Sequence, residues 1–238
     1  GLGTGGSPRT LSAFGEDAAH RRAIYDAKLV RLRSLLDGSA DVELYPSARG
    51  LADRIWQATF SAEGARTIGA HGDGLMLSRV QPPPPDLPAG ASPPRVWDVQ
   101  RPLIDAYLEA LPAGVAPRVL ASRSVVVVDP AERRSMRALA EQGIGRQLEQ
   151  LQGVTPGSLS IDELLERSET HLGTPAEVID SLAADVVAAG ATEVSVQVHS
   201  VDPHPAIAAR SIELFAREVA PALGWKVGHR LQEERHVA

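Results

Sequence analysis

The stretch from Ile55 to Arg79 constrains the fold more than any other part of the chain. A strand-like run leads to the helix-opening Ser61, and a glycine-rich helix exit leads to a second apolar run that ends at Ser78 and Arg79. This order predicts a β-α-β unit with two parallel strands. Because parallel α/β folds place their ligand chemistry just past the strand ends, the unit predicts an anion site, with phosphate as the expected ligand.

The length and composition of the chain place it among ordinary globular proteins. Its 238 residues are 43% hydrophobic and 23% charged, which is enough to bury one sizeable core. The formal net charge is −6 and the arginines are scattered, so the sequence shows no basic stripe of the kind that binds nucleic acid. It contains no cysteine, which excludes disulfides, thiolate nucleophiles and cysteine-ligated metals.

The sequence also argues against a membrane location. No stretch approaches the ~20 consecutive apolar residues of a membrane span, and the glycine-rich start lacks the charged and apolar regions of a secretory leader. We therefore expect a cytoplasmic protein with no membrane partner and no nucleic-acid partner. Because the chain begins at Gly1 without methionine, we also expect that it is not a complete translation product.

The rest of the chain continues the alternation of strands and helices. Strands are expected over 118–128, which ends in four consecutive valines, and over 192–199. Helices are expected over 17–36, from the Asp129–Pro130 cap to 151, and over 96–111, 161–170, 174–189 and 205–219. A short extended piece is expected over 42–45 and a frayed, charged tail over 225–238. With few aromatics and no hairpin signals, this rhythm predicts an α/β fold with a parallel sheet.

Several signals mark the ends of these helices. Asp37–Gly38 ends the first long helix, and Gly190 closes the helix that begins near Thr174. Thr174 is the expected N-cap of that helix, with Pro175 in its first position and Glu177 in its third. This last arrangement predicts a capping box.

The segment from Gln81 to Arg95 contains seven prolines, four of them consecutive. Proline lacks a backbone donor and fixes its φ angle, so regular secondary structure is not expected there. The segment is too long for a plain connector, which suggests a lid or a contact surface. A linker between domains is an equally open interpretation.

The opening GLGTGG matches the dinucleotide-binding pattern G-x-G-x-x-G in letters only. That interpretation requires a strand directly before the motif and a helix directly after it, and no residues precede it here. The interpretation we favour is the exit of a strand into a loop. Glycines there would let a ligand or another backbone segment come close.

Three side chains at strand ends are candidates for anion binding. Ser61 offers its hydroxyl beside the free amides of a first helical turn, although it could equally be a plain N-cap with Glu63 behind it. Ser78 and Arg79 end the next strand, and Arg79 offers a fork of donors, although a surface ion pair is the alternative. Neighbouring parallel strands point these ends at the same space.

The histidines provide weaker candidates. His199 ends a predicted strand and is a candidate acid or base, with a structural histidine as the alternative. His171 is expected to pack or cap, and His204 could pair with His199 as a metal ligand. Because no carboxylate or third histidine stands at a fitting spacing, no metal site is expected.

Four motifs, TFSAEGAR, GDGLMLSR, AFGED and HLGTPAEV, together resemble the bacterial-luciferase-like family of flavin monooxygenases, and in particular an FMN-dependent subgroup. The resemblance runs from Gly1 to about Leu223. It implies a (β/α)₈ TIM barrel that binds flavin at the C-terminal ends of its strands. It also implies that Ser61, Gly64, Ser78 and Arg79 hold the flavin phosphate, with Thr4 and Gly5 beside them. The proline-rich stretch would be a mobile insertion over the active site.

One departure from the family is large. In the family, several strands and helices precede GLGTGG, so this chain would be a barrel truncated at its N-terminus, from roughly strand 4 or 5 to strand 8. Residues 1–224 would be this barrel portion, with its insertion at about 81–95, followed by the charged tail 225–238. The catalytic residues and those around the flavin ring would mostly lie upstream of Gly1. Open strand edges would then have to be covered or paired between chains, and we expect a homo-oligomer.

The resemblance implies that reduced FMN and O₂ oxygenate a small organic substrate, with a separate flavin reductase supplying the reduced cofactor. One alternative is a hydride-transfer oxidoreductase that uses the deazaflavin F420 on the same fold. A second is a flavin-binding or incomplete barrel without turnover.

Overall fold

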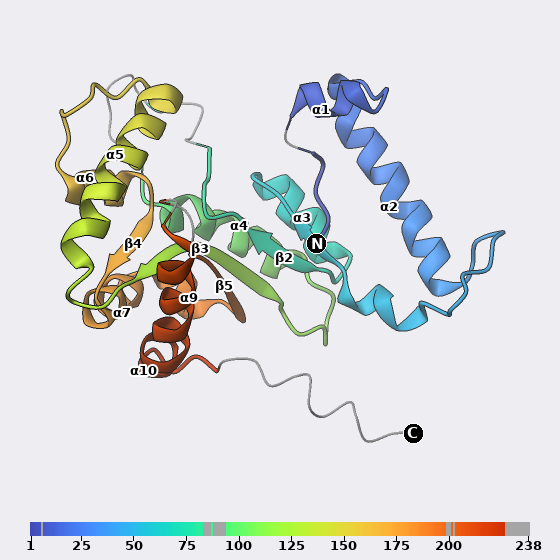
Figure 1. The fold of residues 1–238 in the computed structure, drawn as a ribbon. Helices are drawn as coiled ribbons and strands as arrows, with labels where there is room; N and C mark the ends of the chain where they lie inside the picture. Colours follow the sequence, from blue (N-terminus) through green and yellow to red (C-terminus); the bar gives the residue numbers. More distant parts are fainter. Residues whose placement is uncertain (6, 83–86, 88–93, 199–200, 202, 227–238) are drawn as a thin grey trace. The chain divides into compact units, whose positions relative to one another are not determined.

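The computed structural model describes residues 1–5, 7–82, 87, 94–198, 201 and 203–226 (Figure 1). Their contacts form two compact units. Unit 1 comprises residues 1–77 and 102–120, and unit 2 comprises residues 78–101 and 121–238. The division falls inside one helix and one strand, so each unit is described by itself.

Hydrogen bonding orders four strands as β1-β2-β3-β4, and a fifth strand, β5, pairs with β3. The β1–β2 and β3–β4 pairings are both parallel. The predicted α/β class with a parallel sheet is therefore confirmed, whereas the truncated (β/α)₈ barrel stays a prediction. Among the described residues, no helix is both long enough and apolar enough to cross a membrane.

Unit 1 begins with an extended segment and continues mainly through helices. Its elements are α1 (Pro8–Ala13), η1 (Ala18–His20), α2 (Arg21–Asp37), η2 (Arg49–Arg54), β1 (Trp56–Ala58), α3 (Ala62–Ala70) and β2 (Gly74–Leu77). Leu2 forms a parallel bridge with Gln57, through bonds from Leu2 N to the Trp56 oxygen (2.8 Å) and from Ala58 N to the Leu2 oxygen (2.9 Å). The GLGTG segment thus leaves an extended stretch for a loop, as the sequence predicts.

The predicted β-α-β unit is present. Trp56 of β1 lies in register with Gly74 of β2, and a Cβ at Gly74 would lie 2.3 Å from the Trp56 ring. Helix α3 buries Ala65 and Ile68. Glycine at position 74 is therefore what lets the indole lie across the neighbouring strand.

A buried polar cluster joins α2 to the sheet of unit 1. The Tyr25 hydroxyl donates to Gln57 Oε1 (2.8 Å), Gln57 Nε2 donates to Asp73 Oδ2 (2.6 Å), and Arg33 pairs with the same carboxylate. Burial, followed by the charge of Asp73, raises the pKa of Tyr25, so the phenol stays protonated and keeps donating. Gly38 ends α2 with φ 80°, as predicted.

One expectation for unit 1 is wrong. Residues 42–45 form no β-strand, and Val42 and Tyr45 lie in bends. Val42, Leu44 and Tyr45 are exposed, so this β-favouring segment has no partner strand to join.

Unit 2 carries the larger core. Its elements are α4 (Val96–Ala110) and β3 (Val119–Val127), both shared with unit 1, followed by α5 (Arg133–Gln152), α6 (Ile161–Arg167), β4 (Thr170–Gly173), α7 (Pro175–Ala183), α8 (Val186–Gly190), β5 (Glu193–Gln197), α9 (Pro205–Leu214), η3 (Phe215–Val219) and α10 (Ala220–Ala222). Helix α4 confirms the helix predicted over 96–111, and α9 with the π-helical η3 confirms the one predicted over 205–219.

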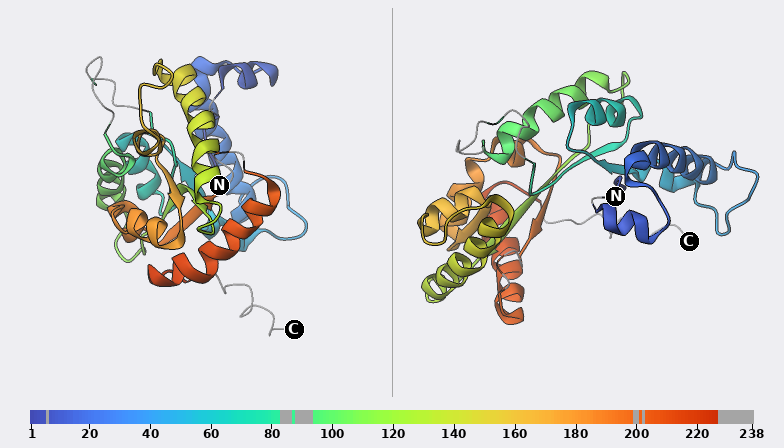
Figure 2. Two further views of the ribbon diagram at one scale, coloured as in Figure 1. Left: turned by 60° about the vertical axis from the view of Figure 1, so that its left-hand side comes forward. Right: turned by 90° about the horizontal axis from the view of Figure 1, so that it is seen from above.

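The valine run of β3 is buried on both faces, as predicted. Val126 and Val128 pack in one apolar cluster with residues of α5 and α6. Val125 and Val127 pack in another, with residues of α7, α9 and η3. The long helix α5 can be followed in yellow-green beside the β3–β4 pair in Figure 2. Strand alternation sends successive valines into these two cores.

Strand β4 was not predicted, because the helix expected over 161–170 ends at Arg167. Glu169 then takes a left-handed conformation with φ 51°, and residues 170–173 pair in parallel with 124–127 of β3. Four residues are too few to show a strand period in the sequence. His171 therefore lies within a strand rather than just before a helix.

Two helix boundaries also differ from expectation. Helix α5 begins at Arg133, and Asp129 does not cap it but pairs with Arg210 (Nε–Oδ2 2.9 Å). The helix expected over 174–189 is broken into α7 and α8, because the Asp185 carboxylate accepts bonds from the Val187 and Ala188 amides (3.0 and 2.9 Å). A side chain that bonds to its own backbone in this way starts a new helix.

At the C-terminal end, Trp225 packs against Phe215, with the ring centroids 6.3 Å apart. The tail predicted to fray from residue 225 therefore begins with an anchored tryptophan. Residues 227–238, like most of the proline-rich stretch, lie outside the described residues.

Candidate functional site

In unit 1, Ser61 caps the N-terminus of α3. Its backbone is extended (φ −129°, ψ 147°), and its Oγ accepts a bond from the Gly64 amide (3.1 Å). The amides of Ala62 and Glu63 open the helix and have no acceptor within it. Ser61 is exposed, and its hydroxyl proton remains available to a ligand. Ser61 therefore has the geometry of a plain N-cap, and that geometry leaves donors at the positive end of a helix dipole.

Gly64 has a packing role in this turn. A Cβ at Gly64 would lie 2.1 Å from Thr59 Oγ1 and 3.1 Å from Ser61 Oγ. Thr59 Oγ1 in turn accepts a bond from the Ser61 amide (3.2 Å). A larger residue at position 64 would push apart the turn that carries Ser61.

Thr4 and Gly5 also belong to unit 1. The bridge between Leu2 and Gln57 places the GLGTG segment alongside β1, and Gly5 adopts φ 79° just beyond it. Thr4–Gly5 and Ser61 thus follow two bridged, parallel extended segments at their C-terminal ends. The structure brings these predicted residues to the same edge of unit 1.

In unit 2, Ser78 and Arg79 form the turn that follows β2. Ser78 Oγ accepts a bond from the Val80 amide (3.2 Å), and Arg79 Nη1 donates to Ser124 Oγ on β3 (3.3 Å). Arg79 is half-buried, and within the described ranges it takes part in no ion pair. Because Ser61 belongs to unit 1, the predicted convergence of these strand ends stays a prediction.

A network of buried polar side chains from β3, α4 and the start of α8 reaches this turn. Arg123 is fully buried; its Nε and Nη2 pair with Asp185, and Nη2 also donates to Gln100 Oε1 (3.0 Å). Gln100 Nε2 donates to the Ser78 carbonyl oxygen (2.7 Å). Burial alone would raise the pKa of Asp185, but the bonds and charge of Arg123 hold it below its ordinary value.

We did not predict this network of buried side chains from the sequence. A signal for part of it was present, since Arg123 stands two residues before the four valines in a predicted buried strand. A charge in such a place needs a buried partner. The partners lie 23 and 62 residues away, and their positions could not be read from the sequence.

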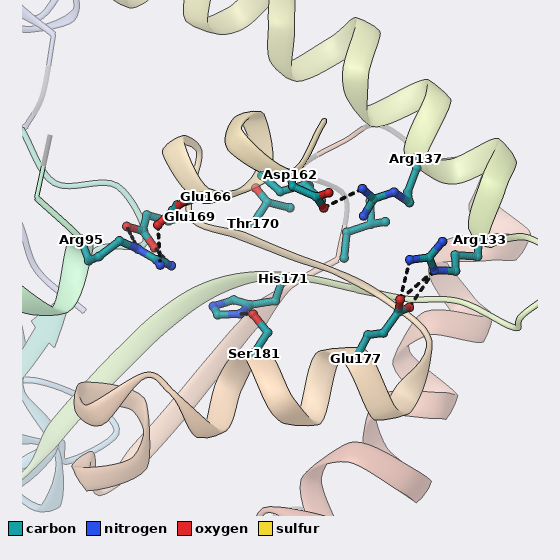
Figure 3. Close-up of a pocket in the computed structure, with 12 residues that line it drawn as sticks. Arg95, Arg133, Arg137, Asp162, Glu166, Glu169, Thr170, His171, Glu177 and Ser181 are labelled. Carbon is teal, nitrogen blue, oxygen red and sulfur yellow. Dashed lines mark hydrogen bonds and ion pairs between the residues drawn. The ribbon is translucent and has the colours of Figure 1, made fainter. Parts of the chain in front are cut away.

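A second polar feature of unit 2 is a cleft of about 390 Å³ at β4, shown in Figure 3. Its arginines are paired with carboxylates: Arg95 with Glu166 and Glu169, Arg133 with Glu177, and Arg137 with Asp162. These pairs satisfy the guanidinium groups, so the cleft offers little to an anion.

His171 lies in the wall of this cleft. Its Nδ1 bonds to Ser181 Oγ (2.8 Å), whereas its Nε2 is buried without a partner among the described residues. Burial lowers the pKa of His171 to about 4, so the ring is neutral at physiological pH. The expectation that His171 packs is confirmed.

The other histidines add no metal site. His199 lies outside the described residues, and His204 Nδ1 accepts a bond from the Ala206 amide (3.3 Å) at the start of α9. In the described part of the chain, no three histidine, aspartate or glutamate side chains are placed to share a metal ion.

Comparisons with known proteins give matches among solved structures alone. No family model matches the chain, and no curated protein matches it. The monooxygenase RslO1 from Streptomyces bottropensis is 22% identical over 92% of this chain and 67% of its own, with a TM-score of 0.64. This chain shares its fold with that monooxygenase. The likeness agrees with the α/β class expected from the sequence, and the truncated barrel stays a prediction.

Two further structures show the same fold. One is the oxygenating constituent of 3,6-diketocamphane monooxygenase from Pseudomonas putida, a type II Baeyer-Villiger enzyme in complex with FMN, at 17% identity, 92% and 70% coverage and a TM-score of 0.61. The other is the EDTA monooxygenase EmoA from Chelativorans, at 15% identity, 92% and 64% coverage and a TM-score of 0.54. The chain therefore spans about two thirds of the length of these proteins.

Proposed function

We propose that this chain acts in a flavin-dependent monooxygenase, which uses reduced FMN and O₂ to oxygenate a small organic substrate. The proposal is supported by its fold, which it shares with three proteins named as monooxygenases, one of them solved with FMN. It is also supported by the motifs around Ser61 and Arg79. The substrate, the reductase and the oligomeric state stay predictions.

The observation that carries the proposal is the environment of Arg79. This guanidinium is half-buried, and its recorded partner is the neutral hydroxyl of Ser124 at 3.3 Å. Arg33, Arg95 and Arg123 are also partly or fully buried, and each pairs with a carboxylate. The half-buried Arg118 donates instead to three backbone carbonyl oxygens. A charge taken out of water calls for a counter-charge, and a phosphate monoester would supply one with matching geometry.

The residues of unit 1 fit the same ligand chemistry separately. Ser61 offers a hydroxyl and leads into two amides that have no acceptor within the helix, and Thr4 and Gly5 follow the adjacent extended segment. Helix N-termini of this kind bind phosphate oxygens. We propose Ser61, Gly64, Thr4 and Gly5 as cofactor-binding residues of unit 1, and Ser78 and Arg79 as those of unit 2.

When bound, reduced flavin would supply the electrons and the reaction with O₂. The residues proposed here bind and orient it through its phosphate and carry no proton in the reaction. Both His171 and Asp185 are committed elsewhere, His171 as a neutral packed ring and Asp185 as the partner of Arg123. A group that exchanges protons with the substrate is therefore expected outside the set described above.

The first prediction concerns Arg79. Replacing Arg79 with alanine should weaken FMN binding by about 1 to 3 kcal/mol, which is about 5- to 150-fold in Kd, because charge-assisted bonds to the phosphate are lost. Fluorescence titration of FMN measures the change, and Arg134→Ala, at an exposed position of α5, is the matched control. Equal affinities in wild type and Arg79→Ala would remove Arg79 from the site.

The reaction itself is tested with reduced cofactors. Oxygen uptake with reduced FMN and a substrate panel supports a monooxygenase. Hydride transfer from reduced F420 without oxygen uptake would instead support the deazaflavin alternative, and FMN binding without any turnover would support a binding protein.

A further inference from the structure

We infer that Gln100 is a positioning residue, which fixes the Ser78–Arg79 turn in the conformation that receives a phosphate. The inference rests on the proposed function, because it gives a role to a residue that supports the same turn. The residues involved all belong to unit 2. Gln100 is fully buried on α4, and its two amide ends reach in different directions.

The orientation of the Gln100 amide is set by its neighbours. Its Oε1 faces Arg123 Nη2 at 3.0 Å, and its Nε2 faces the Ser78 carbonyl at 2.7 Å. A guanidinium can only donate and a carbonyl can only accept. Reversing the amide would place donor against donor and acceptor against acceptor, so a single orientation is compatible with both partners.

Arg123 is itself held from two further directions. Asp185 takes its Nε and Nη2, and the Ser122 carbonyl accepts from its Nη1 at 2.8 Å. The side chains of Arg123, Gln100 and Asp185 are all fully buried. A fully satisfied polar network in a buried setting is rigid, since each member loses a bond if it moves. Because Gln100 is held in place, its hydrogen bond also holds the Ser78 carbonyl in place.

The Ser78 carbonyl belongs to the same planar peptide unit as the Arg79 amide. Fixing this carbonyl against Gln100 therefore also fixes the direction of the Arg79 N–H, which points away from Gln100. It also fixes the point from which the Arg79 side chain starts towards Ser124. Gln100 thus determines where two donors of Arg79 lie, although it is itself buried away from any ligand.

A purely structural role for Gln100 would be to satisfy Arg123, and two variants separate the roles. In Gln100→Glu, one carboxylate oxygen still accepts from Arg123, but the other meets the Ser78 carbonyl oxygen without a proton between them. In Gln100→Met, the volume is kept and both bonds are lost. The positioning role predicts that both variants impair phosphate binding, whereas a role limited to Arg123 predicts that the Glu variant does not.

The second prediction compares FMN with riboflavin, which lacks the phosphate. The ratio of the riboflavin Kd to the FMN Kd reports on the phosphate alone, and it does not depend on the folded fraction because both ligands are titrated into one preparation. We expect the ratio to fall at least about fivefold in Gln100→Glu and in Gln100→Met, a difference of about 1 kcal/mol. Gln147→Glu, on an exposed position of α5, should leave the ratio unchanged.

The outcomes distinguish the phosphate site at Arg79 from the positioning role of Gln100. A wild type that binds FMN and riboflavin equally would overturn the phosphate site and the proposed function at Arg79. A wild type whose preference is lost in Arg79→Ala but kept in Gln100→Glu would overturn the role of Gln100 and leave the phosphate site intact. Loss of the preference in both variants supports the inference.

Discussion

At the scale of single residues, the arginines of unit 2 divide by the partner that each one has. Arg123 and Arg95 are paired with carboxylates, whereas Arg79 has a hydroxyl partner and remains able to bind an anion. On this division we propose that the paired arginines contribute to stability and that Arg79 contributes to ligand binding. An arginine of unit 2 is therefore interpreted according to whether a carboxylate is paired with it.

The third prediction concerns Asp185. Asp185→Ala should lower the free energy of unfolding by about 3 to 5 kcal/mol, because it leaves the fully buried Arg123 without a counter-charge and removes the cap of α8. Urea unfolding measures the loss. Asp162→Ala is the control, since Asp162 pairs with Arg137 at an exposed position and should cost less than about 1 kcal/mol. Equal losses in the two variants would contradict a buried pair at Asp185.

At the scale of elements, side chains at the helix ends of unit 2 set where helices α7 and α8 begin. Glu177 bonds back to the Thr174 amide (2.9 Å) and also pairs with Arg133 of α5. The predicted capping box is therefore present, and it is tied to a second helix that the sequence pattern did not indicate. Helix α7 is held at its start by Glu177 and ended by the new helix that Asp185 caps.

The fourth prediction follows from the pKa of Glu177, which the bond from Arg133 lowers from 4.5 to about 2. A depressed carboxyl pKa stabilises the fold above pH 4.5, and this contribution is lost as the pH falls towards 2. Because the pair is more than a third exposed, Glu177→Gln should cost only about 0.5 to 1 kcal/mol at pH 7. Urea titrations at pH 7 and pH 3 should show the difference shrinking in acid.

A matched variant keeps this test specific. Glu141→Gln removes a carboxylate from an exposed position of α5 and should show no such pH dependence. A cost for Glu177→Gln that stayed constant from pH 7 to pH 3 would show that the charge of Glu177 does not contribute to stability.

At the scale of the whole molecule, local sequence patterns predicted the α/β class. The features that were not predicted depend on contacts between residues far apart in the sequence. The β-α-β unit between Ile55 and Arg79 and the four valines of β3 have periods and lengths that determine their structure locally. Strand β4 depends on a partner far along the chain, in β3. The Asp185 carboxylate that caps α8 is also bound by Arg123, 62 residues away. A single sequence carries no signal for such pairings.

The candidate site likewise contains residues that could be predicted from local sequence patterns and one that could not. Ser61 was predictable because an N-cap serine after a strand is a local pattern, and Arg79 because it ends a strand. Gln100 was not predictable, since glutamine within an amphipathic helix is ordinary. Its role follows only from the buried bond to Ser78.

The fifth prediction applies to the folded chain as a whole. A ligand that binds only the folded state stabilises it by about 2.7 kcal/mol at one hundred times its Kd. FMN should therefore raise the thermal midpoint of the wild type, and the same FMN concentration should raise that of Arg79→Ala less. Riboflavin should stabilise the two proteins equally. A thermal midpoint that FMN leaves unchanged would contradict flavin-phosphate binding.

The contacts of Glu169 affect how freely the proline-rich segment can change in length. Glu169 accepts bonds from Arg95 and from the Val96 amide (2.8 Å), while Gln100, on the same helix, holds Ser78. Both ends of the intervening segment are thereby fastened to α4 and its surroundings. Lengthening a loop whose ends are already fixed is inexpensive, at about 0.6 kcal/mol for each doubling. We therefore expect that changes in the length of this segment leave Arg79 in its place.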